Sequence, residues 1–308
     1  MSSSGNAPLP PCVLHEDDHL LVVDKPAGWN THAPSPYAGE GVYDWLKHRE
    51  PRWAGLAIIH RLDKDTSGVM VFGKTPLANR SLTEQFASRA VRKKYVLITD
   101  RPVATSERTV SSRLVRAGDH HVSAAHGKAA ETRFLLIGPA PPPLVGTLLE
   151  AVPLTGRTHQ IRVHAADIRM PVLGDTLYGG SPYRRICLHA AELGLQHPES
   201  GESLLFMSPA RFGADARQAL RAAVIEPGTT TAYRLIHGAS DGYPGWYVDR
   251  LGDFLLSQSE AADAPEQLAR LEDDLPAHGS YHKTLSRHVR RASPRRSSAR
   301  TARRSPRP

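Results

Sequence analysis

Nine consecutive residues in the first quarter of the chain, His60 to Gly68, carry side chains suited to covalent chemistry. The stretch HRLDKDTSG contains two carboxylates, at Asp63 and Asp65, together with basic and hydroxyl side chains. Short apolar runs at 56–59 and 69–72 predict a strand on either side. A loop held between rigid strands is a common position for catalytic residues. The composition also fits a polar turn in which an aspartate accepts backbone N–H groups, so the residues alone leave both interpretations open.

A second cluster, TGRTHQIRVH at 155–164, predicts a helix entered through Gly156. Thr158, His159 and Arg162 would share its polar face, which could present the arginine to a carboxylate. The opposite, core-facing stripe would consist of Ile161, Ala165 and Ile168. The alternative is an ordinary solvated basic face.

A third cluster, Arg92-Lys93-Lys94-Tyr95, leads into a predicted strand. Cations followed by an aromatic ring suit phosphate contact and base stacking. The alternative is an edge strand kept soluble by its lysines, with Tyr95 half buried.

The patterns along the chain predict a mixed α+β fold. We expect strands at 19–24, 56–59, 69–72, 95–98, 131–137, 145–152, 186–195 and 204–207, and helices at 41–48, 76–90 and 158–168. Strands and helices do not alternate regularly, as they would in a doubly wound parallel sheet. We therefore expect a mixed, mostly antiparallel central sheet with flanking helices and a central active-site cleft.

Seven segments together resemble the motifs of RluA-type pseudouridine synthases, in the order that the family has them. HRLDKDTSG is similar to the family signature H-R-L-D-x-x-T-S-G. The other six are HEDDHLLVVDKPAGWNTH, VRKKYVLI, GKAAETRF, TGRTHQIRVH, VLGDTLYGG and LHAAEL. The resemblance covers residues 12–210 and implies the pseudouridine synthase fold.

The resemblance also implies roles for individual residues. Asp63 matches the nucleophilic aspartate, Tyr95 the tyrosine that stacks on the target base, and Arg162 the arginine that pairs with the catalytic carboxylate. The residues implied to contact the substrate are His60, Arg61, Thr66, Ser67, Arg157, His159 and the apolar Leu188.

The implied reaction breaks the N1–C1′ bond of uridine, rotates the base and joins C5 to C1′. It involves no redox change and no group donor, so we expect no cofactor. An ionised carboxylate can be the covalent partner, and a nearby arginine keeps its pKa low. The uridine must leave its stack to be reached, which requires base flipping.

The charge of the chain is concentrated at its C-terminal end. Net charge is +8 and the pI is about 9.6. Residues 275–308 contain ten Lys or Arg and no Asp or Glu, which leaves 29 basic against 31 acidic residues elsewhere. RNA binding by the rest of the chain must therefore depend on local basic clusters.

Composition and motif order predict five segments. We expect a disordered N-terminus at 1–11, the catalytic domain at 12–210, a linker at 211–230, a further segment at 231–278 and a disordered basic tail at 279–308. Within the fourth, residues 231–260 resemble the segment that precedes the catalytic domain of RNA cytosine-C5 methyltransferases. No cofactor-binding Rossmann sequence follows it, so we expect a truncated segment without methyl-transfer activity.

The remaining features exclude several other classes. The sixteen histidines and two cysteines show no metal-ligand spacing, so we expect no metal. Without a signal peptide or an apolar run of ~20 residues, the chain is expected in the cytoplasm, away from membranes. We expect a monomeric pseudouridine synthase whose partner is ribosomal or transfer RNA. The alternatives are a non-catalytic RNA-binding protein on the same scaffold, or the remnant of a bifunctional synthase–methyltransferase.

Overall fold

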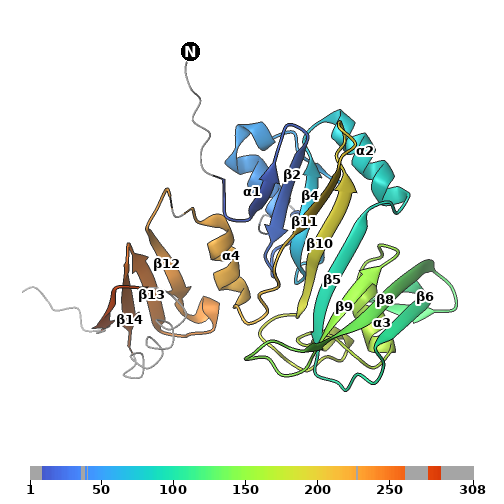
Figure 1. Cartoon of the computed structure of the whole chain (residues 1–308). Coiled ribbons are helices and arrows are strands. Elements are labelled where there is room, and N and C mark those ends of the chain that lie inside the picture. The colour runs from blue at the N-terminus through green and yellow to red at the C-terminus, as the bar shows by residue number, and fades with distance from the viewer. Residues whose placement is uncertain (1–8, 36–38, 40, 227, 261–276, 286–308) are drawn as a thin grey trace, which may run out of the picture. The chain divides into compact units, whose positions relative to one another are not determined.

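The computed structural model describes residues 9–35, 39, 41–226, 228–260 and 277–285 (Figure 1). The chain divides into two compact units, Met1–Thr230 and Thr231–Pro308. Each unit has a sheet and a hydrophobic core of its own.

An eleven-stranded sheet, counted over the described residues, forms the first unit. Its strands are β1 (Val13–Glu16), β2 (Leu20–Lys25), β3 (Ala57–Ile58), β4 (Ser67–Gly73), β5 (Arg92–Thr99), β6 (Glu107–Ala117), β7 (His120–Ala124), β8 (Lys128–Pro139), β9 (Thr147–Pro153), β10 (Leu188–Gln196) and β11 (Ser203–Met207). They lie in the order β1-β2-β4-β10-β5-β9-β8-β6-β7, with β3 paired to β4 and β11 to β10. The β4–β10 pair is parallel and the other pairs of this sheet are antiparallel. The mixed, mostly antiparallel sheet predicted from the sequence is confirmed.

The strand β4 is buried along its whole length because its two faces belong to two different cores. Met70 and Phe72 pack with Val42 and Leu46 of helix α1 (Val42–Arg49). Val69 and Val71 pack on the other face, where Ala78 and Leu82 of helix α2 (Pro76–Ala87) cover them. A strand buried on both faces is a rigid support for the loop that precedes it.

Helix α3 (Gln160–Asp167) begins two residues later than the pattern predicted. His159 precedes it in the left-handed conformation, with φ of 56°, and Thr158 lies in the same turn. The expected helical face shared by Thr158 and Arg162 is therefore wrong. The predicted apolar stripe of Ile161, Ala165 and Ile168 is buried in the core, as expected.

The expected linker at 211–230 is also wrong, because it contains helix α4 (Ala216–Val224). Asp215 caps the helix by accepting the backbone N–H groups of Arg217 and Gln218. Leu220 and Val224 pack against the core that contains Trp53 and Phe72. This segment belongs to the first unit.

The second unit contains a four-stranded sheet in the order β12 (Ala232–His237), β13 (Trp246–Leu251), β14 (Phe254–Ser259) and β15 (Gly279–Thr284). The first two strands are joined through a short 3₁₀ turn, η3 (Gly238–Asp241). The strand β15 lies parallel to β14 over six register pairs. The prediction that disorder begins at residue 279 is therefore wrong for 279–284. Residues 286–308 and 1–8, where disorder was also predicted, lie outside the described residues.

Within the described ranges, no helix is long and apolar enough to cross a membrane.

Candidate active site

The loop that carries Asp63 runs from the end of β3 to the start of β4. The backbone carbonyl of Asp63 accepts the N–H of Thr66 at 3.2 Å, which closes a turn around the two intervening residues. The Asp63 side chain is 26% exposed. It is therefore accessible to a substrate while the backbone on either side of it is held.

Two side chains from the N-terminal motif hold this loop. Lys25 is fully buried, and its Nζ donates to the carbonyls of Pro26 at 2.9 Å, Trp29 at 2.8 Å and Lys64 at 3.0 Å. Thr31 Oγ1 donates to the Leu62 carbonyl at 2.9 Å and lies 3.2 Å from the Leu62 N–H. Leu62 and Lys64, the neighbours of Asp63, are thus hydrogen-bonded to Thr31 and to Lys25 at the end of β2.

Lys25 sits in an unusual environment for a cation. Burial lowers its pKa to about 7, and the nearby charges of Asp65 and Asp63 oppose that shift. Three carbonyl oxygens satisfy the three ammonium donors, so no buried N–H is left without a partner. Lys25 lies in the HEDDHLLVVDKPAGWNTH motif, and the sequence alone predicted no role for it.

Arg162 reaches the site from α3 and is anchored by Asp175. Its Nε donates to Asp175 Oδ2 at 2.6 Å and its Nη2 to Oδ1 at 2.8 Å, a bidentate pair with both side chains buried. The remaining Nη1 lies 3.8 Å from Asp63 Oδ2. Burial opposes ionisation of the guanidinium, but the hydrogen bonds and charge of Asp175 raise the pKa of Arg162. The arginine is therefore a fixed positive charge beside Asp63.

Asp175 lies in the quoted VLGDTLYGG motif, yet the sequence did not reveal that it pairs with Arg162. Only the tertiary structure brings these two residues, thirteen positions apart, into contact.

His159 approaches Asp63 from the turn before α3, with its Nε2 4.0 Å from Asp63 Oδ2. Its other nitrogen, Nδ1, lies 2.8 Å from the hydroxyl of Tyr178, which accepts the backbone N–H of His121 at 2.9 Å. The Tyr178 ring also lies under the Arg162 guanidinium, 4.9 Å from the ring centroid. Burial lowers the pKa of His159, although Asp63 opposes the shift, so this ring is neutral near pH 7.

Tyr95 lies in the middle of the sheet, on β5. Its register partners are Ala190 on β10 and Ala151 on β9, small residues that leave space around the half-buried ring. Burial, and next to it the charge of Asp63, raises the pKa of Tyr95 above its ordinary value. The phenol is therefore protonated throughout the neutral range.

Two of the residues predicted to contact the substrate, His60 and Ser67, have hydrogen-bond partners within the protein. His60 Nε2 accepts the Val71 N–H at 3.1 Å, and its ring stacks on Phe86 with centroids 4.6 Å apart. Burial, and secondarily Lys93, lowers the pKa of His60 to about 3, so it stays neutral. Such a residue positions the loop rather than presenting a charge to RNA.

Ser67 belongs to a buried chain of hydrogen bonds. Its Oγ accepts Nη2 of Arg185 at 2.6 Å and donates to Nδ1 of His189 at 2.8 Å. The other His189 nitrogen, Nε2, donates to the Ser208 carbonyl at 3.0 Å. These bonds connect β4 to β10, where the two strands run parallel.

The other four expected contact residues differ in accessibility. Arg61 is exposed on the loop, whereas Thr66 is buried beneath it. Arg157 is exposed, and its Nε donates to the Ala129 carbonyl at 3.1 Å. Leu188 is 2% exposed and packs in the main core opposite Leu97. Arg61 and Arg157 are thus free to meet a polyanion at the surface.

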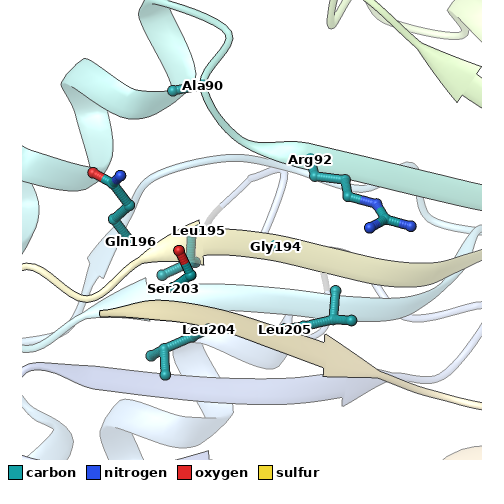
Figure 2. A pocket seen from close by; sticks show the side chains of 8 residues that line it. All are labelled: Ala90, Arg92, Gly194, Leu195, Gln196, Ser203, Leu204 and Leu205. Atoms are coloured by element: carbon teal, nitrogen blue, oxygen red, sulfur yellow. The ribbon is translucent and has the colours of Figure 1, made fainter. Parts of the chain in front are cut away.

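A cavity of about 360 Å³ lies beside the Arg162–Asp175 pair. Asp65, Arg184 and Arg185 contribute to its lining, so its walls are mostly polar and carry both signs of charge. A different hollow of about 320 Å³ lies between β5, β10 and β11, and Figure 2 shows the residues that line it. That lining includes Arg92 but no carboxylate and no histidine.

Among the residues that the structure describes, no group of three or more His, Cys, Asp or Glu side chains is placed to hold a metal ion. A partly exposed carboxylate beside an anchored arginine has the chemistry of a covalent nucleophile.

Comparison with known proteins gives the family. Residues 19–167 match the family model described as RNA pseudouridylate synthase. Ribosomal large subunit pseudouridine synthase C of Yersinia pestis is 36% identical over 217 residues, which cover 66% of this chain and 67% of that protein. Ribosomal large subunit pseudouridine synthase D of Xanthomonas campestris pv. campestris is 35% identical over 230 residues, covering 65% and 66%. The chain therefore belongs to the RNA pseudouridylate synthase family and is a pseudouridine synthase.

A solved structure agrees with this assignment. Human RNA Pseudouridylate Synthase Domain Containing 4 superposes with a TM-score of 0.53 at 27% identity, covering 65% of this chain and 88% of that one. These matches cover about two thirds of the chain.

Proposed function

We propose that this enzyme isomerises a uridine of large-subunit ribosomal RNA, with Asp63 as the nucleophile. The observation that carries the proposal is the placement of Asp63, whose side chain is partly exposed and lies 3.8 Å from an arginine that Asp175 holds in place. The substrate follows from the relatives, which are named for the ribosomal large subunit. Because synthases C and D match almost equally well, their identities do not select one target uridine.

The residues divide the work as follows. Arg162 places a fixed positive charge 3.8 Å from Asp63, and the Asp63 carboxylate forms the covalent bond to the flipped uridine. The ring of Tyr95 supports the base, and its phenol keeps its proton at neutral pH. His159 and Tyr178 hold the rim of the site beside Asp63. Arg61 and Arg157 meet RNA phosphates at the surface. Every step uses groups of the chain itself.

The test is pseudouridine mapping of total RNA from cells with and without the gene, rescued by the wild type, Asp63→Asn or Asp119→Asn. Asp119 is an exposed aspartate on the β6–β7 turn, so its variant makes the same chemical change away from the site. We expect a site that wild type and Asp119→Asn restore and Asp63→Asn does not. A site restored by all three would exclude Asp63 as the nucleophile. Failure to find any dependent site would favour a non-catalytic RNA-binding role.

The same proposal includes a cytoplasmic monomer, because ribosomal RNA is the substrate named for the relatives and Asp63, Tyr95 and Arg162 come from one chain. Sedimentation of the purified protein at micromolar concentration tests the oligomeric state. A dimer that dissociates only with loss of activity would contradict it.

We further propose that the second unit derives from a methyltransferase module, as the similarity of residues 231–260 implies. The motif residues have structural positions that support this. Asp241 accepts the His237 N–H at 2.6 Å, and Gly242 and Gly245 adopt positive φ in the turn before β13. We expect no binding of S-adenosylmethionine by the full chain in equilibrium dialysis, since no Rossmann unit is among the described residues. Stoichiometric binding would mean that methyl-transfer capacity is retained.

A further inference from the structure

One face of the second unit's sheet is not used by that unit's core. Ile236, Trp246, Val248 and Leu255 form the core and alternate with residues on the other side of the strands. We call that other side the open face; its main members are Arg234, Tyr247, Leu251, Phe254, Tyr281 and Lys283.

Register and side-chain contacts place these residues together. Leu251 pairs with Phe254 across β13 and β14, and Leu256 pairs with Tyr281 across β14 and β15. Asp249 accepts Arg234 Nη2 at 3.0 Å from one neighbouring strand and lies 3.4 Å from Gln258 of the other. The face is therefore continuous over all four strands.

The composition of the open face is unusual for a solvent-facing sheet surface, which is ordinarily polar. Phe254 is 58% exposed, Tyr281 67% and Leu251 48%. The Phe254 ring also meets the His278 ring edge-on, with centroids 6.5 Å apart. Exposed aromatic rings on a sheet are the platforms on which unpaired nucleic-acid bases stack.

Cations lie on and beside the open face, although Arg234 is paired with Asp249. Lys283 is exposed at the end of β15, next to Gln258 in register. On the first strand, the Arg234 guanidinium lies over the Tyr247 ring, 5.2 Å from its centroid. The sequence that follows β15, residues 286–308, contains nine arginines and no carboxylate. Exposed aromatic rings and cations together match bases joined by phosphates, whereas an acidic peptide would use only the cations.

We propose that the open face binds single-stranded RNA, with bases stacked on Phe254 and Tyr281 and phosphates near Lys283. The proposal rests on the membership of the chain in an RNA-modifying family and does not depend on the role of Asp63. It gives the second unit a function separate from catalysis, which is to hold an unpaired part of the substrate.

The test is fluorescence anisotropy of the full chain with a labelled twelve-nucleotide single-stranded RNA and with a duplex of the same length. We expect Phe254→Ala and Tyr281→Ala each to weaken single-strand binding about tenfold or more, because each removes one stacking platform. Tyr281→Phe retains the ring and should bind like wild type. Met207→Ala, which removes a 61% exposed apolar side chain from β11, is the matched control and should also bind like wild type.

Two further readouts make the test specific. Duplex binding should not change in the alanine variants, since paired bases cannot stack on the rings. Raising the salt concentration should weaken all the proteins by reducing phosphate contacts, while the difference between Tyr281→Ala and Tyr281→Phe persists.

The proposal fails if both alanine variants bind the single strand like wild type, because the arginines alone would then explain binding. It also fails if these variants convert an associated form to a monomer in sedimentation, because the open face would then be a self-association surface. Thermal melts check that the variants are folded. Pseudouridine formation in the same preparations keeps the two proposals apart, since Asp63→Asn should abolish product and leave the oligonucleotide affinity unchanged.

Discussion

Replacing Asp175 by asparagine should destabilise the catalytic unit and slow the reaction, although Asp175 forms no covalent bond. The side chains of Asp175 and Arg162 are 1% and 7% exposed, and two hydrogen bonds of 2.6 and 2.8 Å join them. Asparagine keeps the shape and one acceptor but removes the negative charge. Arg162 then remains buried, with Asp63 at 3.8 Å as its nearest carboxylate.

The expected size follows from the burial. Removing one partner of a buried ion pair costs about 3–5 kcal/mol, because the other charge is left uncompensated. The retained amide oxygen places Asp175→Asn near the lower limit, about 3 kcal/mol. For a unit of this size that is a decrease of roughly 6–12 °C in the melting temperature. The reaction should slow on the order of 100-fold, since an arginine misplaced by about 1 Å no longer holds the site's geometry.

The assay combines urea denaturation with single-turnover pseudouridine formation at saturating RNA. The double variant Arg162→Met/Asp175→Leu is the matched control, because replacing both partners by apolar side chains restores most of the stability. It should regain stability and remain inactive. If Asp175→Asn lowered the unfolding free energy by less than about 1 kcal/mol, the loss would be no larger than that of an exposed ion pair. That result would refute the argument that burial makes this pair important for stability.

Three other changes have directions fixed by the structure. Between about pH 7 and 10.5 Lys25 keeps its proton in the unfolded chain but has lost it in the folded chain, so its contribution to the unfolding free energy rises with pH. Lys25→Met should therefore reduce the increase in unfolding free energy between pH 7 and pH 9, measured by urea denaturation. An unchanged increase would contradict the lowered pKa of Lys25. Ser67→Ala removes the buried hydrogen-bond partner of Arg185 Nη2 and His189 Nδ1, so the unfolding free energy should fall by about 1–3 kcal/mol. Urea denaturation of the variant measures this decrease. An unchanged unfolding free energy would mean that water replaces the hydroxyl. Since the pKa of Tyr95 is raised, ionisation of its phenol should not reduce the rate of pseudouridine formation up to pH 9. A rate that falls below pH 9 in the wild type but not in Tyr95→Phe would show that the phenol ionises in that range.

The sequence was sufficient to predict the fold class and to identify the two segments that carry Asp63 and Arg162. The strands β2 and β4 are short, apolar and bounded by turns, so local pattern determined them. The signature loop and α3 were separately identifiable, and in the fold Arg162 lies 3.8 Å from Asp63. A strand or motif can be predicted from local sequence when a single segment contains all the residues that define it.

What the sequence could not supply depends on contacts between distant segments. Asp175 and Lys25 have local surroundings typical of turns, and their roles arise only when Arg162 and the Lys64 carbonyl come within hydrogen-bond distance. His60 was expected to meet the substrate because of its place in the signature, but the Val71 N–H and the Phe86 ring occupy it. Polar side chains in a signature can serve the backbone as well as the ligand.

The elements beyond the catalytic motifs were missed for a different reason. Helix α4 lies in an Ala/Arg-rich stretch whose composition is typical of a linker, but an Asp215 cap and two core-facing residues, Leu220 and Val224, stabilise it. The strand β15 has little apolar character of its own and is specified by the neighbouring β14. Tertiary partners decide the state of such weakly patterned segments.

The position of β10 has a consequence for how the enzyme is made. This strand comes late in the chain, yet within the sheet it lies between β4, which follows Asp63, and β5, which carries Tyr95 (Figure 1). A nascent chain that has not yet reached Leu188 therefore contains Asp63, Tyr95 and Arg162 but lacks the strand that joins the two halves of the sheet. We expect such an incomplete chain to be inactive, because β4 and β5 are not held side by side until β10 pairs with both.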